Sequence, residues 1–201
     1  MYIARILYPV KVLGPGERIG IWMCGCHHGC RGCSNPELWD FDEKYHVTSA
    51  PIMDFISKIA ESNRIDGFTI SGGEPFLQPD ALRELIPFFR RFCSDILVYS
   101  GFTYSELKRR YPDILSSITV LIDGKYIESR NRNCFLRGSD NQKIRILDPQ
   151  MKDFYENYIR GNTNRIQNFR AAQGFVSVGI HQPGYHQDLA ENLAGKGIIV
   201  D

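Results

Sequence analysis

Short runs of apolar and β-branched residues recur along the chain, separated by longer segments with helical spacing. Residues 2–13 form one such run, and the later runs predict buried strands over residues 18–24, 68–70, 96–99 and 118–122. Helix starts are indicated at Thr48, at Gln78 and at the capping pattern of Thr103 and Glu106. Strands that alternate with helices form a parallel sheet with right-handed crossovers, so the pattern predicts an α/β fold. The strand–helix units number fewer than eight, so any barrel is expected to be incomplete.

Two of the predicted helices carry specific expectations. The first helix places four apolar residues on one face, which we expect to be buried: Ile52, Phe55, Ile56 and Ile59. Pro87 is expected to kink or split the second helix, because proline lacks the N–H that a helix interior needs.

The C-terminal quarter is less regular. We expect a strand over 143–147, a helix after Asp148-Pro149, a polar loop over 160–168 and a strand over 175–180. Apolar positions in the tail indicate that it packs back onto the fold: Leu189, Leu193 and residues 197–200. We therefore expect one domain over 1–201, in which 148–201 is an extension that packs on or completes a partial barrel.

Charge and composition narrow the class of protein. The 201 residues include 24 Lys and Arg against 23 Asp and Glu, so the net charge of +1 gives no global attraction to nucleic acid or to a membrane surface. No apolar run approaches the length that spans a bilayer, and no secretory signal is visible. We expect a cytoplasmic protein in a reducing compartment, with no nucleic acid or membrane partner.

Four of the six cysteines lie within residues 24–33, and Cys26, Cys30 and Cys33 are spaced C-x3-C-x2-C. Thiolates bind iron, zinc or another thiol, and iron–sulfur clusters usually take four cysteines. Three cysteines leave one metal position without a protein ligand, which is typical of catalytic metal sites. Cys24 ends an apolar run and is expected to be a buried structural thiol.

From the spacing alone, two other interpretations of these cysteines stay open. A disulfide is disfavoured, because a chain of this length can bury a core unaided and the expected compartment is reducing. A zinc site would draw its ligands from the four cysteines together with His27 and His28. No second C-x2-C or H-x3-H pair follows to complete a common zinc pattern.

Glycine and polar residues follow the predicted strands at Ser71–Pro75, Ser100-Gly101 and Asp123-Gly124. The ends of parallel strands form one edge of a sheet, where binding sites are built. Gly72 and Gly73 let the backbone approach a ligand closely, and the Glu74 carboxylate can accept hydrogen bonds from an ammonium group. Alone, this stretch is typical of a tight turn; on the same edge as three cysteines, it predicts a ligand site.

Together these residues resemble the radical S-adenosylmethionine (SAM) superfamily. Cys26, Cys30 and Cys33 match its cluster signature, and residues 72–74 match its Gly-Gly-Glu motif. The resemblance implies an incomplete (βα) barrel of parallel strands and a [4Fe-4S] cluster with SAM on its open iron. Reductive cleavage of SAM would give methionine and a 5′-deoxyadenosyl radical, so the cofactor carries the chemistry and no catalytic side chain is assigned.

The resemblance also implies which residues bind the cofactors. Cys26, Cys30 and Cys33 are the expected cluster ligands. The expected SAM contacts are Gly32, Cys33, Ser34, Gly72, Gly73 and Glu74. Ser100 and Asp123 are added from their position at strand ends alone.

Further stretches look like the activating enzyme of the anaerobic (class III) ribonucleotide reductase, over residues 14–18, 33–35, 98–103, 121–124 and 136–142 and at Trp39. That family implies hydrogen abstraction from a glycine of the reductase, which leaves a glycyl radical, and a flavodoxin- or ferredoxin-type electron donor. Two features depart from the pattern. Position 32 is glycine where many superfamily members carry an aromatic that packs on adenine. Residues 148–201 extend beyond the compact form of the family, and 174–180 are expected to add a strand near the SAM site or a docking surface.

The alternatives are a radical SAM enzyme that acts on another glycyl radical enzyme, or on a small molecule in the manner of 7-deazaguanine synthases. Many activases of other glycyl radical enzymes carry extra cysteine clusters, whereas Cys93 and Cys134 are isolated and resemble buried small hydrophobes. A zinc-binding interaction module is the alternative from another class.

Overall fold

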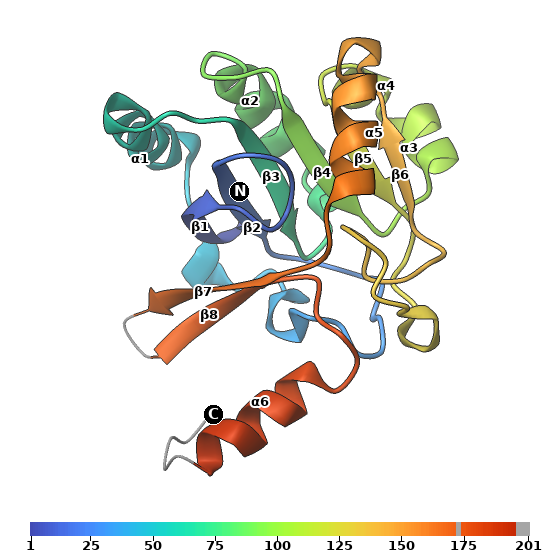
Figure 1. Ribbon diagram of the computed structural model, residues 1–201. Coiled ribbons are helices and arrows are strands. Elements are labelled where there is room, and N and C mark those ends of the chain that lie inside the picture. Colours follow the sequence, from blue (N-terminus) through green and yellow to red (C-terminus); the bar gives the residue numbers. More distant parts are fainter. Residues whose placement is uncertain (172–173, 196–201) are drawn as a thin grey trace.

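The computed structural model describes residues 1–171 and 174–195 (Figure 1). Its centre is a six-stranded sheet in the order β1-β2-β3-β4-β5-β6. The four inner strands run parallel to one another: β2 (Arg18–Met23), β3 (Gly67–Gly72), β4 (Ile96–Ser100) and β5 (Val120–Asp123). The edge strands β1 (Ile3–Val10) and β6 (Lys143–Ile146) are antiparallel to their neighbours.

The mixed α/β architecture with a mainly parallel sheet is as predicted, but the expectation of parallel strands is wrong at both edges. Parallel neighbours need a crossover of a dozen or more residues, usually a helix. Only residues 11–17 join β1 to β2. Residues 124–142, between β5 and β6, contain just the short 3-10 helix Glu128–Arg130. The chain therefore turns back on itself at each edge.

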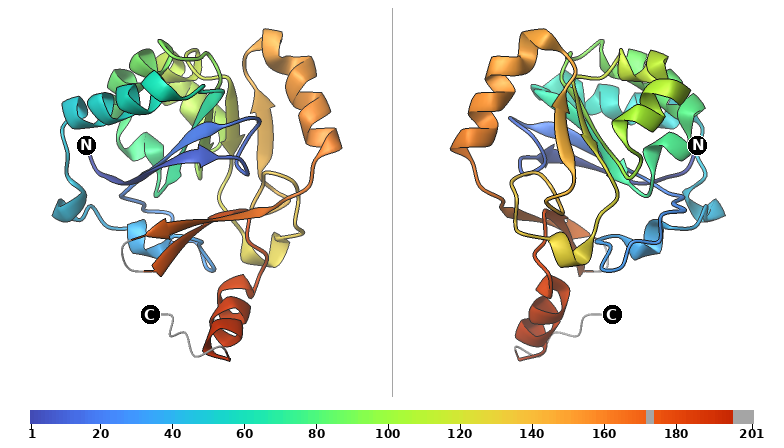
Figure 2. Two further views of the ribbon diagram at one scale, coloured as in Figure 1. Left: turned by 60° about the vertical axis from the view of Figure 1, so that its left-hand side comes forward. Right: turned by 90° about the vertical axis from the view of Figure 1, so that its right-hand side faces the viewer.

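One face of the sheet is covered by α1 (Ser49–Ser62), α2 (Pro79–Phe89), α3 (Tyr104–Arg110) and α4 (Pro112–Leu115) (Figure 2). The core beneath them includes buried side chains from all four inner strands, among them Ile21, Ile70, Val98 and Leu121. Further 3-10 helices lie at Pro36–Leu38, Glu43–Tyr45, Pro75–Leu77 and Pro149–Met151. No helix of the described ranges is long and apolar enough to cross a membrane.

The helices begin near the predicted positions, but two of their predicted details differ in the structure. The capping box of Thr103 and Glu106 is present at the start of α3. Phe55 was expected in the core but is 48% exposed, because the buried stripe of α1 is narrower and centres on Ile52 and Ile56. Pro87 does not split α2, since it lies on the exposed side of the last turn, where little helix remains to disrupt.

The opposite face of the sheet is covered by α5 (Lys152–Gly161) and by a hairpin of β7 (Ile166–Ala171) and β8 (Gly174–Gly179) (Figure 2). Tyr155 of α5 is fully buried against Leu97, Val120 and Ile122. The polar loop expected over 160–168 is wrong in part, because β7 begins at Ile166 and pairs with β8 in a separate two-stranded sheet. Helix α6 (Tyr185–Ala194) follows, and residues 197–200 lie outside the described residues.

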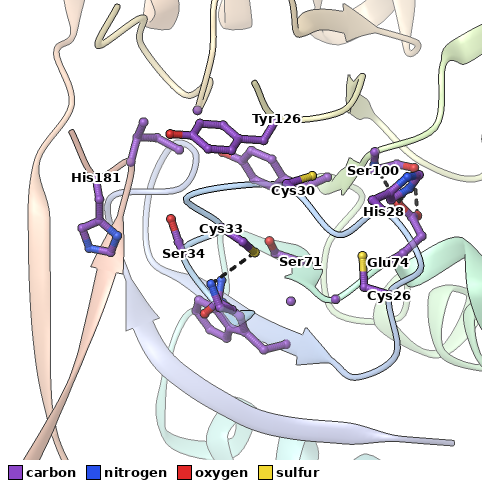
Figure 3. A pocket seen from close by; sticks show the side chains of 18 of the residues that line it. Cys26, His28, Cys30, Cys33, Ser34, Ser71, Glu74, Ser100, Tyr126 and His181 are labelled. Carbon is purple, nitrogen blue, oxygen red and sulfur yellow. Dashed lines mark hydrogen bonds and ion pairs between the residues drawn. The ribbon is translucent and has the colours of Figure 1, made fainter. Parts of the chain in front are cut away.

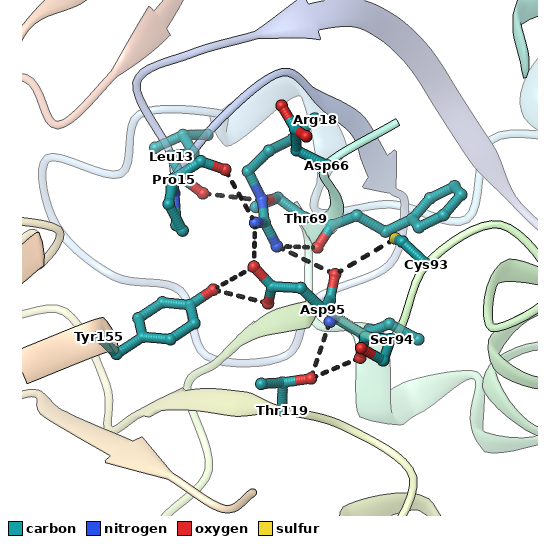
Figure 4. A network of polar contacts seen from close by, with 12 residues as sticks. Leu13, Pro15, Arg18, Asp66, Thr69, Cys93, Ser94, Asp95, Thr119 and Tyr155 are labelled. Carbon is teal, nitrogen blue, oxygen red and sulfur yellow. Dashed lines mark hydrogen bonds and ion pairs between the residues drawn. The ribbon is translucent and has the colours of Figure 1, made fainter. Parts of the chain in front are cut away.

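A buried polar network joins the N-terminal ends of the strands to α5 (Figure 4). The guanidinium of Arg18, which begins β2, donates to Asp95 Oδ2 at 2.6 Å and to Thr69 Oγ1 at 2.7 Å. The Tyr155 hydroxyl donates to both carboxylate oxygens of Asp95, at 2.7 and 2.9 Å. Asp95 directly precedes β4, so the network fixes three strands and a helix of the extension at one end of the sheet.

Candidate functional site

The C-terminal ends of the inner strands border one cavity, at the opposite end of the sheet from the Arg18 network (Figure 3). The three cysteines of the C-x3-C-x2-C pattern line it, together with five other predicted residues: Ser34, Gly72, Gly73, Glu74 and Ser100. These side chains come from the loop after β2 and from the ends of β3 and β4. The fold therefore brings most of the predicted site residues together.

The Gly-Gly-Glu strand end holds the start of the cysteine loop by its backbone. The N–H of Gly73 donates to the Met23 carbonyl at 2.7 Å, and the N–H of Glu74 donates to the Gly25 carbonyl at 2.8 Å. A Cβ on Gly73 would lie 2.5 Å from the Gly25 oxygen. Gly72 has φ +107°, in the left-handed region that favours glycine, and its Cβ would collide with the Met23 backbone. Both glycines are thus needed for the approach of β3 to the loop.

The three thiols are free and half-buried. Burial raises the pKa of the Cys26 and Cys30 thiols, and the N–H of Asn35 points to the Cys33 sulfur at 3.4 Å. Cys24 differs from them: it is fully buried in an apolar cluster with Val10, and burial raises its pKa to about 11. Cys24 does not line the cavity, as expected for a structural thiol.

The donor set fits an iron–sulfur cluster. Within residues 1–171 and 174–195, no group of three or more His, Cys, Asp or Glu side chains converges on the position of a single metal ion. Cysteines that bind different irons of one cluster need not converge in that way, and three soft thiolates around one cavity are suitable ligands for it. Of the histidines in the zinc alternative, His27 is exposed and does not line the cavity, whereas His28 lines it with its Nε2 3.0 Å from Glu74 Oε2.

Glu74 is a fully buried carboxylate at the end of the cavity nearest Cys26 (Figure 3). Its Oε1 accepts hydrogen bonds from the Ser100 hydroxyl at 2.8 Å and from the Phe76 N–H at 3.0 Å. Its Oε2 accepts from the Gly101 N–H at 2.6 Å and lies 3.0 Å from His28 Nε2. Since an ionised carboxylate can only accept, the contact is a hydrogen bond when the histidine carries its hydrogen on Nε2. Ser100 therefore acts on Glu74 in this structure.

Two predicted SAM contacts lie outside the cavity lining. The Asp123 carboxylate accepts hydrogen bonds from Arg145 Nε at 2.7 Å and from the Tyr104 N–H at 2.8 Å, so it joins β5 to β6 and to the start of α3. Gly32 is exposed with φ +69°, and a Cβ there would lie 2.5 Å from Glu128 Oε1. Both positions have a structural reason for their residue type.

Several lining residues were not predicted from the sequence as site residues: Trp39, Ser71, Tyr99, Tyr126, Gln142 and residues 177–181. Trp39, Tyr99 and Gln142 belong to the residues that carried the family resemblance. Ser71 directly precedes the Gly-Gly-Glu motif and could have been found by extending it. Tyr126 has no local pattern that would mark it.

Comparison with known proteins first defines the class. Residues 12–145 match the family model described as a 4Fe-4S single cluster domain, which agrees with the three thiols at the cavity. The chain is therefore an iron–sulfur protein of that class.

The relatives narrow the class to one family. The chain is 35% identical over 145 residues to the anaerobic ribonucleoside-triphosphate reductase-activating protein of Haemophilus influenzae. The alignment covers 68% of this chain and 93% of the relative. The protein of that name from Escherichia coli K12 is 30% identical over 148 residues, covering 70% and 96%. Its namesake in Enterobacteria phage T4 is 31% identical over 143 residues, covering 69% and 90%. The chain belongs to this family of activating proteins.

Proposed function

We propose that the chain is a radical SAM enzyme that generates a glycyl radical on anaerobic ribonucleotide reductase. The observation that carries the proposal is the cavity itself, where three cysteine thiols and the buried Glu74 face one space in a chain of the activating-protein family. A cavity of this kind can hold a cluster and a charged small molecule side by side. We also infer that the sheet is the partial barrel of the radical SAM superfamily and that residues 1–201 form one domain.

In this proposal Cys26, Cys30 and Cys33 hold a [4Fe-4S] cluster with one open iron. When bound, the cluster supplies the electron that cleaves SAM into methionine and a 5′-deoxyadenosyl radical. The electron comes from a flavodoxin- or ferredoxin-type donor. The radical takes a hydrogen atom from a glycine Cα of the reductase, so the products are 5′-deoxyadenosine and the glycyl radical.

The residues around Glu74 orient the amino-acid end of SAM. Glu74 is suited to an ammonium group, because it is a buried negative charge held in place by the Gly101 and Phe76 backbone. The backbone donors are fixed, whereas His28 is a half-buried loop side chain. We therefore infer that the ammonium group shares Glu74 Oε2 with His28 or replaces it there. Gly72, Gly73 and Ser34 line the same space; Gly32, Ser100 and Asp123 would act through their neighbours.

The proposal is tested by incubating the reconstituted, reduced protein with SAM and a purified anaerobic ribonucleotide reductase under anaerobic conditions. The expected result is the EPR signal of a glycyl radical on the reductase, together with formation of 5′-deoxyadenosine. A matched sample with the Cys26→Ala variant should give neither. SAM cleavage without a glycyl radical would refute the reductase as target and favour another substrate. No SAM cleavage by a protein with a full cluster would refute the proposal as a whole.

A further inference from the structure

The hairpin of β7 and β8 forms one wall of the cavity that contains the thiols. Ser177, Val178 and Gly179 of β8, with Ile180 and His181 after it, line that cavity. All five lie beyond residue 145, where the match to the 4Fe-4S family model ends. The relatives are matched over 90–96% of their own length, while about a third of this chain stays outside the match. The hairpin residues that line the cavity therefore lie outside the region that this chain shares with its family.

Hydrogen bonds hold the hairpin to the rest of the fold at two points. Gln167 of β7 accepts a hydrogen bond from the Lys11 N–H at 2.9 Å and donates to the Pro9 carbonyl at 2.7 Å, which ties it to the end of β1. Just after β8, the His181 carbonyl accepts a hydrogen bond from the Asn131 side chain at 2.9 Å. Val178 is 2% exposed in the apolar cluster of Trp22. These hydrogen bonds and the buried valine fix the hairpin to the rest of the fold.

The two ends of the cavity differ in chemistry. Glu74, His28 and Ser100 gather at one end with Cys26, and His181 lies at the other, with Cys33 between them (Figure 3). The first end carries the buried carboxylate, which suits an ammonium group. The hairpin end offers the apolar Val178 and Ile180, the Tyr126 ring, and bare backbone at Gly179. A planar base and a sugar are suited to such a mixture of apolar surface, aromatic ring and a few polar groups.

We propose that the β7–β8 hairpin forms the nucleoside-binding wall of the SAM site, with Ser177 and Ile180 facing the adenosyl group. This inference rests on the proposed function, because it assigns one end of the same cofactor. If the amino acid of SAM is at Glu74 and its sulfur is near the thiols, the nucleoside must extend toward the hairpin. The Ser177 hydroxyl lies 3.0 Å from both His181 Nε2 and the Tyr185 hydroxyl, so its position is fixed before any ligand enters.

The test is anaerobic binding of SAM, methionine and 5′-deoxyadenosine to the full-length, cluster-loaded protein, measured by equilibrium dialysis. Ser177→Phe fills the hairpin end of the cavity. We expect it to raise the Kd for SAM and for 5′-deoxyadenosine about tenfold or more and to leave the Kd for methionine unchanged. The matched control is Arg170→Phe, which places the same ring at an exposed position of the same hairpin. It should bind all three molecules like the wild type.

Iron content and thermal unfolding are measured on every variant, so that loss of binding is separated from loss of folding. If Ser177→Phe is unstable, the Ile180→Ala variant is used to test the inference, because this change only shortens a side chain. We expect it to raise the Kd for SAM about threefold. A folded variant with wild-type affinity for SAM and 5′-deoxyadenosine overturns the inference. Loss of reductase binding with SAM binding intact would also overturn it and identify a docking surface. A wild-type protein that binds no SAM refutes instead the proposed function.

Discussion

Two buried carboxylates at opposite ends of the sheet differ in what surrounds them. Asp95, at the N-terminal end, is paired with the fully buried Arg18 and with the Tyr155 hydroxyl (Figure 4). Glu74, at the C-terminal end, is held by two backbone N–H groups, Ser100 and the half-buried His28 (Figure 3). Asp95 has a permanent counter-charge inside the protein. Glu74 has no arginine or lysine partner among the described residues.

The difference indicates that one end of the sheet is built for stability and the other for binding. A buried ion pair is costly to break, because the remaining charge is left without a partner. A buried carboxylate held by backbone and hydroxyl donors keeps its negative charge available to a cationic ligand. The thiols lie at the second end only. The following experiments compare the two ends, from the largest expected effect to the smallest.

The largest effect is expected at the cysteines. Changing Cys26, Cys30 or Cys33 to Ala should remove the [4Fe-4S] cluster, because each thiolate would bind a different iron and no spare cysteine lines the cavity in the described part of the chain. Iron and acid-labile sulfide analysis after anaerobic reconstitution measures the loss. The folded state should survive, since the Arg18 network lies at the other end of the sheet.

The matched control for the cysteine variants is Cys24→Ser. Cys24 is buried outside the cavity, so the variant should bind iron and sulfide like the wild type, with a modest loss of stability. Loss of the cluster in Cys24→Ser would show that the ligand assignment is wrong. One zinc ion in place of iron and sulfide would refute the cluster itself.

The second effect belongs to the N-terminal end. Arg18→Met keeps an unbranched apolar chain but leaves Asp95 buried without its counter-charge, so we expect a loss of about 3–5 kcal/mol in the free energy of unfolding. Urea unfolding of the protein before cluster loading measures it. The control is Arg83→Met, which breaks exposed ion pairs to Asp80 and Asp113 and should cost less than about 1 kcal/mol. Equal losses would contradict the distinction between the two ends.

The third effect belongs to Glu74. Glu74→Gln preserves the shape of the side chain and removes the negative charge, so the Kd for SAM should rise about tenfold or more while the iron content stays unchanged. Equilibrium dialysis of the cluster-loaded protein measures this. Glu128→Gln is the control, because that carboxylate is outside the cavity lining and forms an exposed ion pair with Arg31. An unchanged affinity in Glu74→Gln would remove Glu74 from the SAM site.

Local sequence patterns were sufficient for the parts of the site that lie at strand ends. The cysteine loop, Gly72–Glu74 and Ser100 each lie at the end of a strand or directly after it, and the ends of neighbouring parallel strands meet at one edge of the sheet. Asp123 met the same criterion, yet its carboxylate is bound by Arg145 and the Tyr104 N–H. Position at a strand end does not reveal which partner a side chain will find.

Local sequence patterns could not predict the contacts that the C-terminal extension makes with the sheet. Tyr155 bonds to Asp95 across 60 residues, and Gln167 bonds to Pro9 across 158. Neither contact leaves a periodic signal, because it depends on how α5 and the hairpin dock on the sheet. The pairing of β8 with β7 and not with the main sheet has the same origin: residues 166–168, the first half of β7, were expected to belong to a loop.

The smallest effect tests the tie between the extension and the N-terminal end. Burial raises the pKa of the Tyr155 hydroxyl, so it stays protonated and donates to Asp95. Tyr155→Phe removes that donor but leaves the Arg18 pair, so we expect a loss of about 1–2 kcal/mol in the free energy of unfolding and no change in SAM affinity. Tyr158→Phe is the control: its ring lies beside that of Tyr155, but among the described residues its hydroxyl makes no hydrogen bond to Asp95. Urea unfolding compares the two variants. If Tyr155→Phe weakened SAM binding with little loss of stability, the two ends of the sheet would be coupled through the extension, and the division between a stabilising end and a binding end would be wrong.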